Sequence, residues 1–250
     1  MRDLGRRIYG AAAIALGLVG LAWGAFATVW QPVQDYTPFR TPLAYLTALV
    51  LIGAGTAVQF RRSAPPALLV LAAVFAAFAL LWAPRVIGYP QIVATWAGFA
   101  EQFAVAIAGV LAWLALQGRE APRLATVLRV AFGICAVFWA FNHFTNIPQT
   151  SGMVPAWIPG RTFWAWATGF GHLAAGLALI SCVMAVLAAR LLAAMFLVFQ
   201  LCIWVPGLFA VPANHVVWAG NAVNLTAIAA AWVLAEFLEG RSRQGRVRSG

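Results

Sequence analysis

Glu101 is a carboxyl residue that lies well inside an apolar stretch, where ionisable side chains are rare. It stands about ten residues into the run from 92 to 116, Gln102 follows it, and no basic residue is nearby in the sequence. In a helix that rises about 1.5 Å per residue, this position falls near the middle of a membrane-spanning segment. Because a charge is costly in hydrocarbon, Glu101 is either a protonated, hydrogen-bonded structural group or a carboxyl that relays protons or binds a ligand.

Three histidines could supply imidazole groups on one side of a membrane. His143 is expected at the end of a helix, His172 within the following helix and His215 at the start of the last helix. Convergent imidazoles can ligate copper, zinc or haem iron, or can hydrogen-bond the carbonyl of a quinone. No HxxxH or HxH spacing is present. We therefore predict no metal site and retain a quinone or similar small molecule as the candidate ligand, with ordinary packing as the alternative for each ring.

Amide side chains accompany these groups. Asn142 precedes His143 at a helix end, beside a long loop from 143 to 161 that could build and cap a pocket. Asn221 and Asn224 share one face of the last predicted helix, where they either lock helices together or contact a ligand. The candidate binding residues are therefore His143, His172, His215, Glu101, Asn142 and Asn224.

The composition indicates that lipid surrounds most of the chain. Of 250 residues, 64% are hydrophobic and 9% are charged, and the mean hydropathy is +0.88. Soluble domains are about 45–50% apolar and about 25% charged, and a helical membrane crossing needs about 20 apolar residues. We predict an all-α, polytopic membrane bundle with helices near 8–30, 42–60, 66–83, 92–116, 124–142, 162–186, 191–209 and 216–238. Arg190 divides the longest apolar stretch and predicts a tight turn there.

The arginines predict how the chain is oriented. All sixteen basic residues are arginine, and with eight crossings only Arg40, Arg85 and Arg161 fall on the outer side. The positive-inside rule then places both termini in the cytoplasm and the protein in the cell membrane, plasma or inner. This topology accounts for the net charge of +10, so nucleic acid is not predicted as a partner. The thirteen cytoplasmic arginines are Arg2, Arg6, Arg7, Arg61, Arg62, Arg119, Arg123, Arg129, Arg190, Arg241, Arg243, Arg246 and Arg248.

An internal repeat with an offset of about 121–122 residues relates the two halves of the chain. The matching segments are Arg40-Thr41 with Arg161-Thr162, Gly55 with Gly176, Trp82-Ala83-Pro84 with Trp204-Val205-Pro206, Pro90 with Pro212, and Trp96-Ala97-Gly98 with Trp218-Ala219-Gly220. Four helices per repeat is an even number, so we predict two parallel four-helix repeats. The predicted units are 1–118, 119–240 and a basic cytoplasmic tail at 241–250.

Sequence motifs of enzymes are lacking. The sequence has no GxSxG, GxxxxGK[ST], HExxH or CxxC, and its three cysteines, Cys135, Cys182 and Cys202, stand singly in apolar stretches. These absences disfavour hydrolases, ATP-driven pumps and a redox disulfide, and they favour a protein that is not an enzyme on its own.

Residues 142–176 resemble the DoxX-like family of membrane proteins. The resemblance rests on Asn142-His143-Phe144-Thr145, Pro148, Met153-Val154-Pro155-Ala156-Trp157-Ile158-Pro159, Thr168-Gly169 and Gly176. It implies a four-helix unit over 124–238, a degenerate copy over 8–116, and a role beside quinone-linked redox chemistry. The chain departs from the family pattern at His172, where relatives often carry Glu.

Three functions are compatible with these features. The first is an accessory or quinone-interacting subunit of a redox system, with a ligand pocket at the outer face and Glu101 handling a proton. The second is a small-molecule transporter with its site near Glu101, Gln102 and Asn224, and the third is a non-catalytic membrane scaffold. The expected partners are the lipid bilayer, a redox protein and further copies of the chain.

Overall fold

The computed structural model describes residues 3–27, 29–119 and 121–249, with side chains placed through Ser242. Within these ranges the regular structure is helical, and eight helices are long and apolar enough to cross a membrane. The predicted all-α bundle with eight crossings is confirmed, and the chain is a multi-pass integral membrane protein whose surface contacts lipid. Arg2 and the side chains of Arg243, Arg246 and Arg248 lie outside the described residues.

The two halves of the chain contain corresponding helices. The first half comprises α1 (Leu4–Trp23), α2 (Arg40–Val58), α3 (Ala64–Leu81), the short α4 (Ala83–Gly88) and α5 (Val93–Gln117). The second half comprises α6 (Pro122–Thr145), the short α7 (Ile147–Met153), α8 (Arg161–Ser181), α9 (Ala185–Phe199), the π-helical turn η1 (Gln200–Trp204), the short α10 (Val205–Ala210) and α11 (His215–Ser249).

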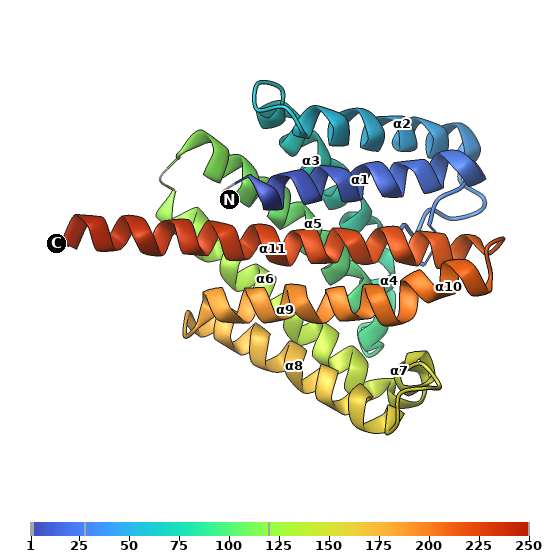
Figure 1. The fold of residues 1–250 in the computed structure, drawn as a ribbon. Helices are drawn as coiled ribbons and strands as arrows, with labels where there is room; N and C mark the ends of the chain where they lie inside the picture. Colours follow the sequence, from blue (N-terminus) through green and yellow to red (C-terminus); the bar gives the residue numbers. More distant parts are fainter. Residues whose placement is uncertain (1–2, 28, 120, 250) are drawn as a thin grey trace.

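The two halves pack against each other symmetrically, because the first helix of each half contacts the last helix of the other half. Helix α1 of the first half packs on α11 of the second, α6 of the second packs on α5 of the first, and α5 also contacts α11. Figure 1 shows α2, α1, α11, α9 and α8 side by side in one layer, with α3, α5 and α6 in a second layer. Both chain ends lie at the same end of the bundle, as an even number of crossings requires.

Three predicted helix boundaries are wrong. The last helix, predicted to end near 238, continues to Ser249 and so includes most of the predicted tail at 241–250. The first helix ends at Trp23 rather than near 30, because Gly24 takes the left-handed conformation with a φ of 58° and ends the helix. The turn expected at Arg190 lies instead at residues 182–184, where Cys182 and Met184 have positive φ. Arg190 belongs to α9, and its guanidinium pairs with the Glu239 carboxylate at 2.6 Å. An arginine at a helix surface can satisfy its charge in this way without ending the helix.

One structural frame recurs in both halves. A buried arginine on the first helix donates to the last carbonyls of the second helix: Arg6 to Val58 in the first half, and Arg129 to Leu179 and Ile180 in the second. These donors satisfy carbonyl groups that have no partner within their own helix. The positive-inside rule places both arginines in the cytoplasm, and in the structure both also bind a helix end.

The crossing of the first two helices is also repeated. A Cβ on Gly55 would lie 2.6 Å from the Gly10 carbonyl oxygen, and a Cβ on Gly176 would lie 2.8 Å from the Gly133 carbonyl oxygen. Glycine at both positions therefore lets the two backbones touch, which is how helices pack closely when lipid removes the hydrophobic driving force. A tryptophan that follows the third long helix of each half packs against a glycine of the fourth, Trp82 against Gly98 and Trp204 against Gly220.

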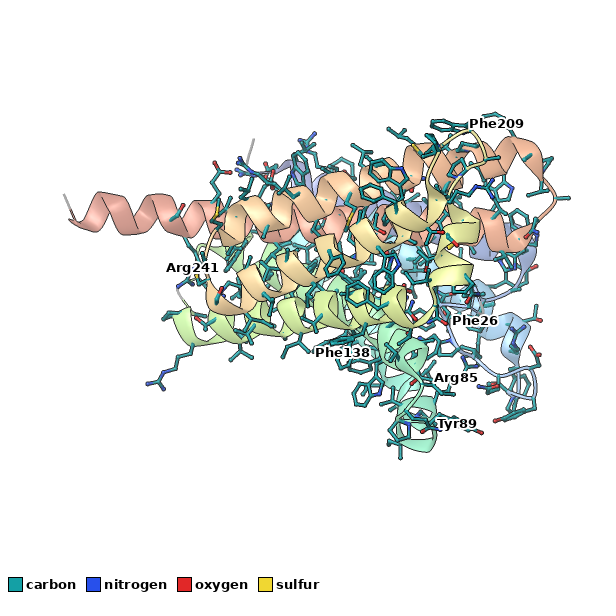
Figure 2. All side chains as sticks on the ribbon, turned by 90° about the horizontal axis from the view of Figure 1, so that it is seen from below. Phe26, Arg85, Tyr89, Phe138, Phe209 and Arg241 are labelled. Carbon is teal, nitrogen blue, oxygen red and sulfur yellow. The ribbon has the colours of Figure 1, made fainter. Side chains whose placement is uncertain are left out.

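Arginines and aromatic rings lie at the two ends of the bundle. Figure 2 shows Arg241 near one end, and Arg85, Tyr89 and Phe209 toward the other. Arg85 lies over the Trp82 ring at 4.9 Å, and Arg241 lies over the Phe237 ring at 5.9 Å. Such residues are typical of the two membrane–water interfaces, so their separation fits a bundle that spans the bilayer.

Candidate ligand-binding cavity

A cavity of about 360 Å³ lies mainly in the second half, with walls from α5, α6, α8, α9, η1 and α11. Its walls are mostly apolar and aromatic, including Trp139, Trp164, Phe196, Phe199 and Trp204. The predicted capping loop does line it, through Thr150, Met153, Val154, Pro155 and Ile158. The cavity is large enough for a small organic ring and lies among membrane-spanning helices.

Five of the six predicted binding residues line this one cavity. They are Glu101, Asn142, His143, His172 and Asn224. His215, the sixth predicted residue, does not line this cavity and stacks on Trp23 with 5.2 Å between ring centroids. His215 stands at the start of α11, next to Trp23 at the end of α1 rather than next to α6.

His143 and His172 form a pair, with ring centroids 4.9 Å apart. The His172 Nδ1 lies 2.9 Å from the Thr168 carbonyl oxygen, which can only accept, so this nitrogen carries the proton and donates it. The His172 Nε2 is buried and has no hydrogen-bond partner among the described residues. In the neutral ring it therefore presents an unused lone pair.

The same reasoning fixes the tautomer of His143. Its Nδ1 lies 3.1 Å from the Thr168 hydroxyl and 3.4 Å from the Ala165 carbonyl oxygen. The Ala165 carbonyl can only accept, and the Thr168 hydroxyl, which lies 2.8 Å from the Trp164 carbonyl oxygen as a donor to it, can accept from the same His143 nitrogen. The His143 Nδ1 therefore donates, and in the neutral ring its Nε2 is a hydrogen-bond acceptor.

Glu101 brings a carboxyl group to the cavity from the first half of the chain. It is half-buried on α5, and no described residue forms a hydrogen bond or ion pair with it. An unpartnered carboxyl inside a membrane bundle is rare unless it serves a ligand or a proton. Its counterpart in the repeat is Val223, which also lines the cavity, so the carboxyl belongs to one half only.

The two asparagines are held in place by neighbouring side chains. The Asn142 Oδ1 accepts from the Asn146 side chain at 3.0 Å. The Asn224 Nδ2 donates to the Phe196 carbonyl at 2.9 Å and to the Gln200 Oε1 at 2.7 Å. Gln200 in turn donates to Asn221. The expected interhelical lock therefore exists, and it leaves the Asn224 Oδ1 without a donor among the described residues.

Trp139 lines the cavity but is not among the six predicted binding residues. Its ring lies 5.9 Å from the His172 ring and 5.6 Å from the Phe196 ring, and its buried Nε1 has no acceptor among the described residues. A signal was available, because Trp139 precedes His143 by four residues and so shares its helix face. The unused N–H adds a donor to the acceptors of the two histidines.

Local sequence explains the shape of the cavity. A Cβ on Gly169 would lie 2.5 Å from the Phe144 ring, so glycine there lets α8 approach α6 beside His143. Pro206 cannot donate to the carbonyl of residue 202, and the preceding turn widens into η1, where Val205 N–H donates to the Gln200 carbonyl. Such π-helical turns are frequent at functional sites, and this one brings Cys202, Ile203 and Trp204 to the cavity wall.

The described residues contain no group of three or more histidine, cysteine, aspartate or glutamate side chains arranged to hold a metal ion. No protein-family model, curated protein or solved structure matches the chain.

Proposed function

We propose that this membrane protein binds a lipophilic quinone-type ligand in the cavity and serves as an accessory subunit of a membrane redox system. One observation carries the proposal: an aromatic cavity among membrane-spanning helices holds a histidine pair, an unpartnered carboxyl and an unpartnered indole N–H. Buried polar atoms without partners are costly, and a bound molecule that pairs with them removes that cost.

The chemistry of a quinone headgroup fits these walls. It is a flat ring that can pack on Trp139, Phe196 and Phe199, and its ring oxygens can pair with polar groups at the cavity surface. An isoprenoid tail is apolar and can remain among the helices or in the bilayer. Glu101 is placed to exchange a proton with such a ligand, because it lines the same cavity as the histidines.

The resemblance to DoxX-like proteins supports the same proposal. The segment that carries it supplies His143 and Thr168 together with the cap residues Val154, Pro155 and Ile158, all of which line the cavity. In this proposal the chain is a fused pair of DoxX-like units in the cell membrane, with both termini in the cytoplasm and the cavity toward the outer side. Its redox partner protein contacts the same bundle.

The test is to identify what the protein carries when it is purified in mild detergent. Extracted small molecules are analysed by mass spectrometry, and an ultraviolet–visible spectrum is recorded for wild type, His143→Ala and His215→Ala. We expect a quinone or its quinol in the wild type and in His215→Ala, whose imidazole lies outside the cavity, and a loss of the quinol-type ligand in His143→Ala, whose imidazole can accept from a ligand hydroxyl. A wild type that stays free of quinone after incubation with decylubiquinone contradicts the proposal.

Transport of a small molecule is a second candidate function. It is favoured by the extension of the cavity to the junction between the two halves. Glu101 and Val223 are counterparts in the two halves, and both line it, so it extends to the junction of α5 and α11. Repeat-built transporters place their sites at such junctions. A polar metabolite in the extract, without a quinone, would favour transport over redox binding.

A further inference from the structure

We infer that the cavity binds the reduced, hydroxyl-bearing form of its ligand more tightly than the oxidised form. This inference rests on the proposed quinone-type function and adds the redox state that the site selects. It follows from which hydrogen-bonding atoms are already used by the protein and which are left for a ligand.

The two histidines are left as acceptors. The His143 Nδ1 donates toward the Thr168 hydroxyl, and the His172 Nδ1 donates to the Thr168 carbonyl. Each neutral ring therefore has an Nε2 that can only accept a hydrogen bond. The His172 Nε2 is buried without a partner among the described residues, and the hydrogen bonds of His143 to them involve its Nδ1 alone. A ligand that pairs with either ring must donate a hydrogen.

Asn224 is left as an acceptor in the same way. Its Nδ2 must be the atom that faces the Phe196 carbonyl, because a carbonyl cannot donate, and the same nitrogen reaches Gln200. The remaining Oδ1 can only accept. Three lining residues on three different helices, α6, α8 and α11, therefore each present an unused acceptor.

The reduced and oxidised ligands differ in what they can satisfy. A quinone oxygen only accepts, so it can pair with the Trp139 N–H but leaves the three acceptors unpaired. A hydroquinone hydroxyl both donates and accepts, so it can pair with an imidazole Nε2 and with the Trp139 N–H at once. Glu101 favours neither form, because a carboxyl can donate or accept according to its protonation.

An unpaired buried polar group typically costs more than a made hydrogen bond gains, so the two redox forms should differ clearly in affinity. We expect decylubiquinol to bind at least about tenfold more tightly than decylubiquinone, which corresponds to one satisfied acceptor. The dimethyl ether of decylubiquinol keeps the ring shape but has no hydroxyl hydrogen. We expect it to bind as weakly as the quinone or more weakly.

The experiment titrates these three probes anaerobically into the purified wild-type protein and follows quenching of tryptophan fluorescence, since four tryptophans line the cavity. His143→Leu should reduce the preference for the quinol, whereas His215→Leu, the matched control outside the cavity, should keep it. The wild-type comparison of quinol with its dimethyl ether needs no variant and so does not depend on whether a variant folds.

The outcomes separate the two claims. Equal affinity for quinol and quinone, or tighter binding of the quinone, overturns the selectivity and leaves the proposed quinone function standing. Binding of the dimethyl ether as tight as that of the quinol also overturns it. Failure of all three probes to bind the wild type overturns both the selectivity and the proposed function.

Discussion

Leu16, Val19 and Leu51 occupy the positions in the first half that Trp139, Asn142 and His172 occupy in the second. The correspondence follows from the shared frame, in which Arg6 and Gly10 precede Arg129 and Gly133 by 123 residues, and Gly55 precedes Gly176 by 121. The three first-half side chains are buried and apolar, and Gly20 stands where the second half has His143. One helix arrangement therefore supports a filled apolar interior in one half and a polar-lined cavity in the other.

The third helices of the two halves differ in their backbone just before Pro84 in the first half and Pro206 in the second. In the first half, the backbone N–H of Trp82 donates to the Ala79 carbonyl three residues back. The helix therefore tightens and ends before Pro84. In the second half the helix widens into η1 before Pro206 and continues into α10. The same Trp-x-Pro pattern therefore gives a break in one half and a π-helical wall of the cavity in the other.

The largest predicted effect tests whether the two halves share one frame. We expect Gly55→Val and Gly176→Val each to destabilise the protein by about 3 kcal/mol, because each side chain would collide with the backbone of the neighbouring helix. Thermal unfolding in detergent measures the loss. Gly53→Val is the matched control, since a Cβ at Gly53 meets nothing within 4 Å. A large loss from one glycine only would break the equivalence of the halves.

The next largest predicted effect is on stability, and it tests whether the first half has an apolar interior where the second half has a polar-lined cavity. Leu51→His would place an imidazole in the filled interior of the first half, and we expect it to cost about 1–3 kcal/mol because the ring's second nitrogen would be buried without a partner. The reverse change, His172→Leu, removes a buried unpaired nitrogen and should leave stability unchanged or raised, while ligand binding falls. Thermal unfolding and fluorescence titration of both variants provide the comparison. Destabilisation by His172→Leu would show that His172 has a structural role.

The smallest effect is a change in chemical reactivity without a change in stability. Cys202 lines the cavity, whereas Cys182 is exposed in the turn between α8 and α9. We expect decylubiquinone at ten times its Kd to slow maleimide labelling of Cys202 by up to about tenfold, since the free fraction falls by that factor. Labelling of Cys182 serves as the internal control and should not change. Equal protection of both thiols would point to a general detergent effect.

The sequence was sufficient to predict the fold but not every boundary. Apolar length alone gives eight crossings, because lipid leaves helices as the way to satisfy the backbone over these segments. The end of α1 at Gly24 and the turn at Cys182 depend on local backbone conformations that hydropathy does not register. Arg190 predicted a turn because it divides the longest apolar stretch, whereas α9 already begins at Ala185 and the exposed Arg190 side chain pairs with Glu239 on the neighbouring helix.

The sequence predicts single residues of the candidate site, but tertiary packing decides which of them lie in one cavity. Glu101 and the histidines stand in different halves, and they share a cavity because α5 packs on both α6 and α11. His215 was grouped with the other histidines by side of the membrane alone, which does not distinguish one part of the rim from another. The π-helical turn and the unpartnered Trp139 N–H depend on hydrogen bonds across several helices, so neither could be read from residue spacing.

Photolabelling with an azido-quinone, followed by peptide mapping, tests most directly whether the second half holds the ligand. We expect labelled residues in α6, the loop from 146 to 160, α8 and η1, with labelling removed by excess decylubiquinone and with little label at the first-half counterparts around Leu16 and Leu51. Competable label spread equally over both halves, or confined to the lipid-facing surface of α2, would contradict a ligand site in the cavity.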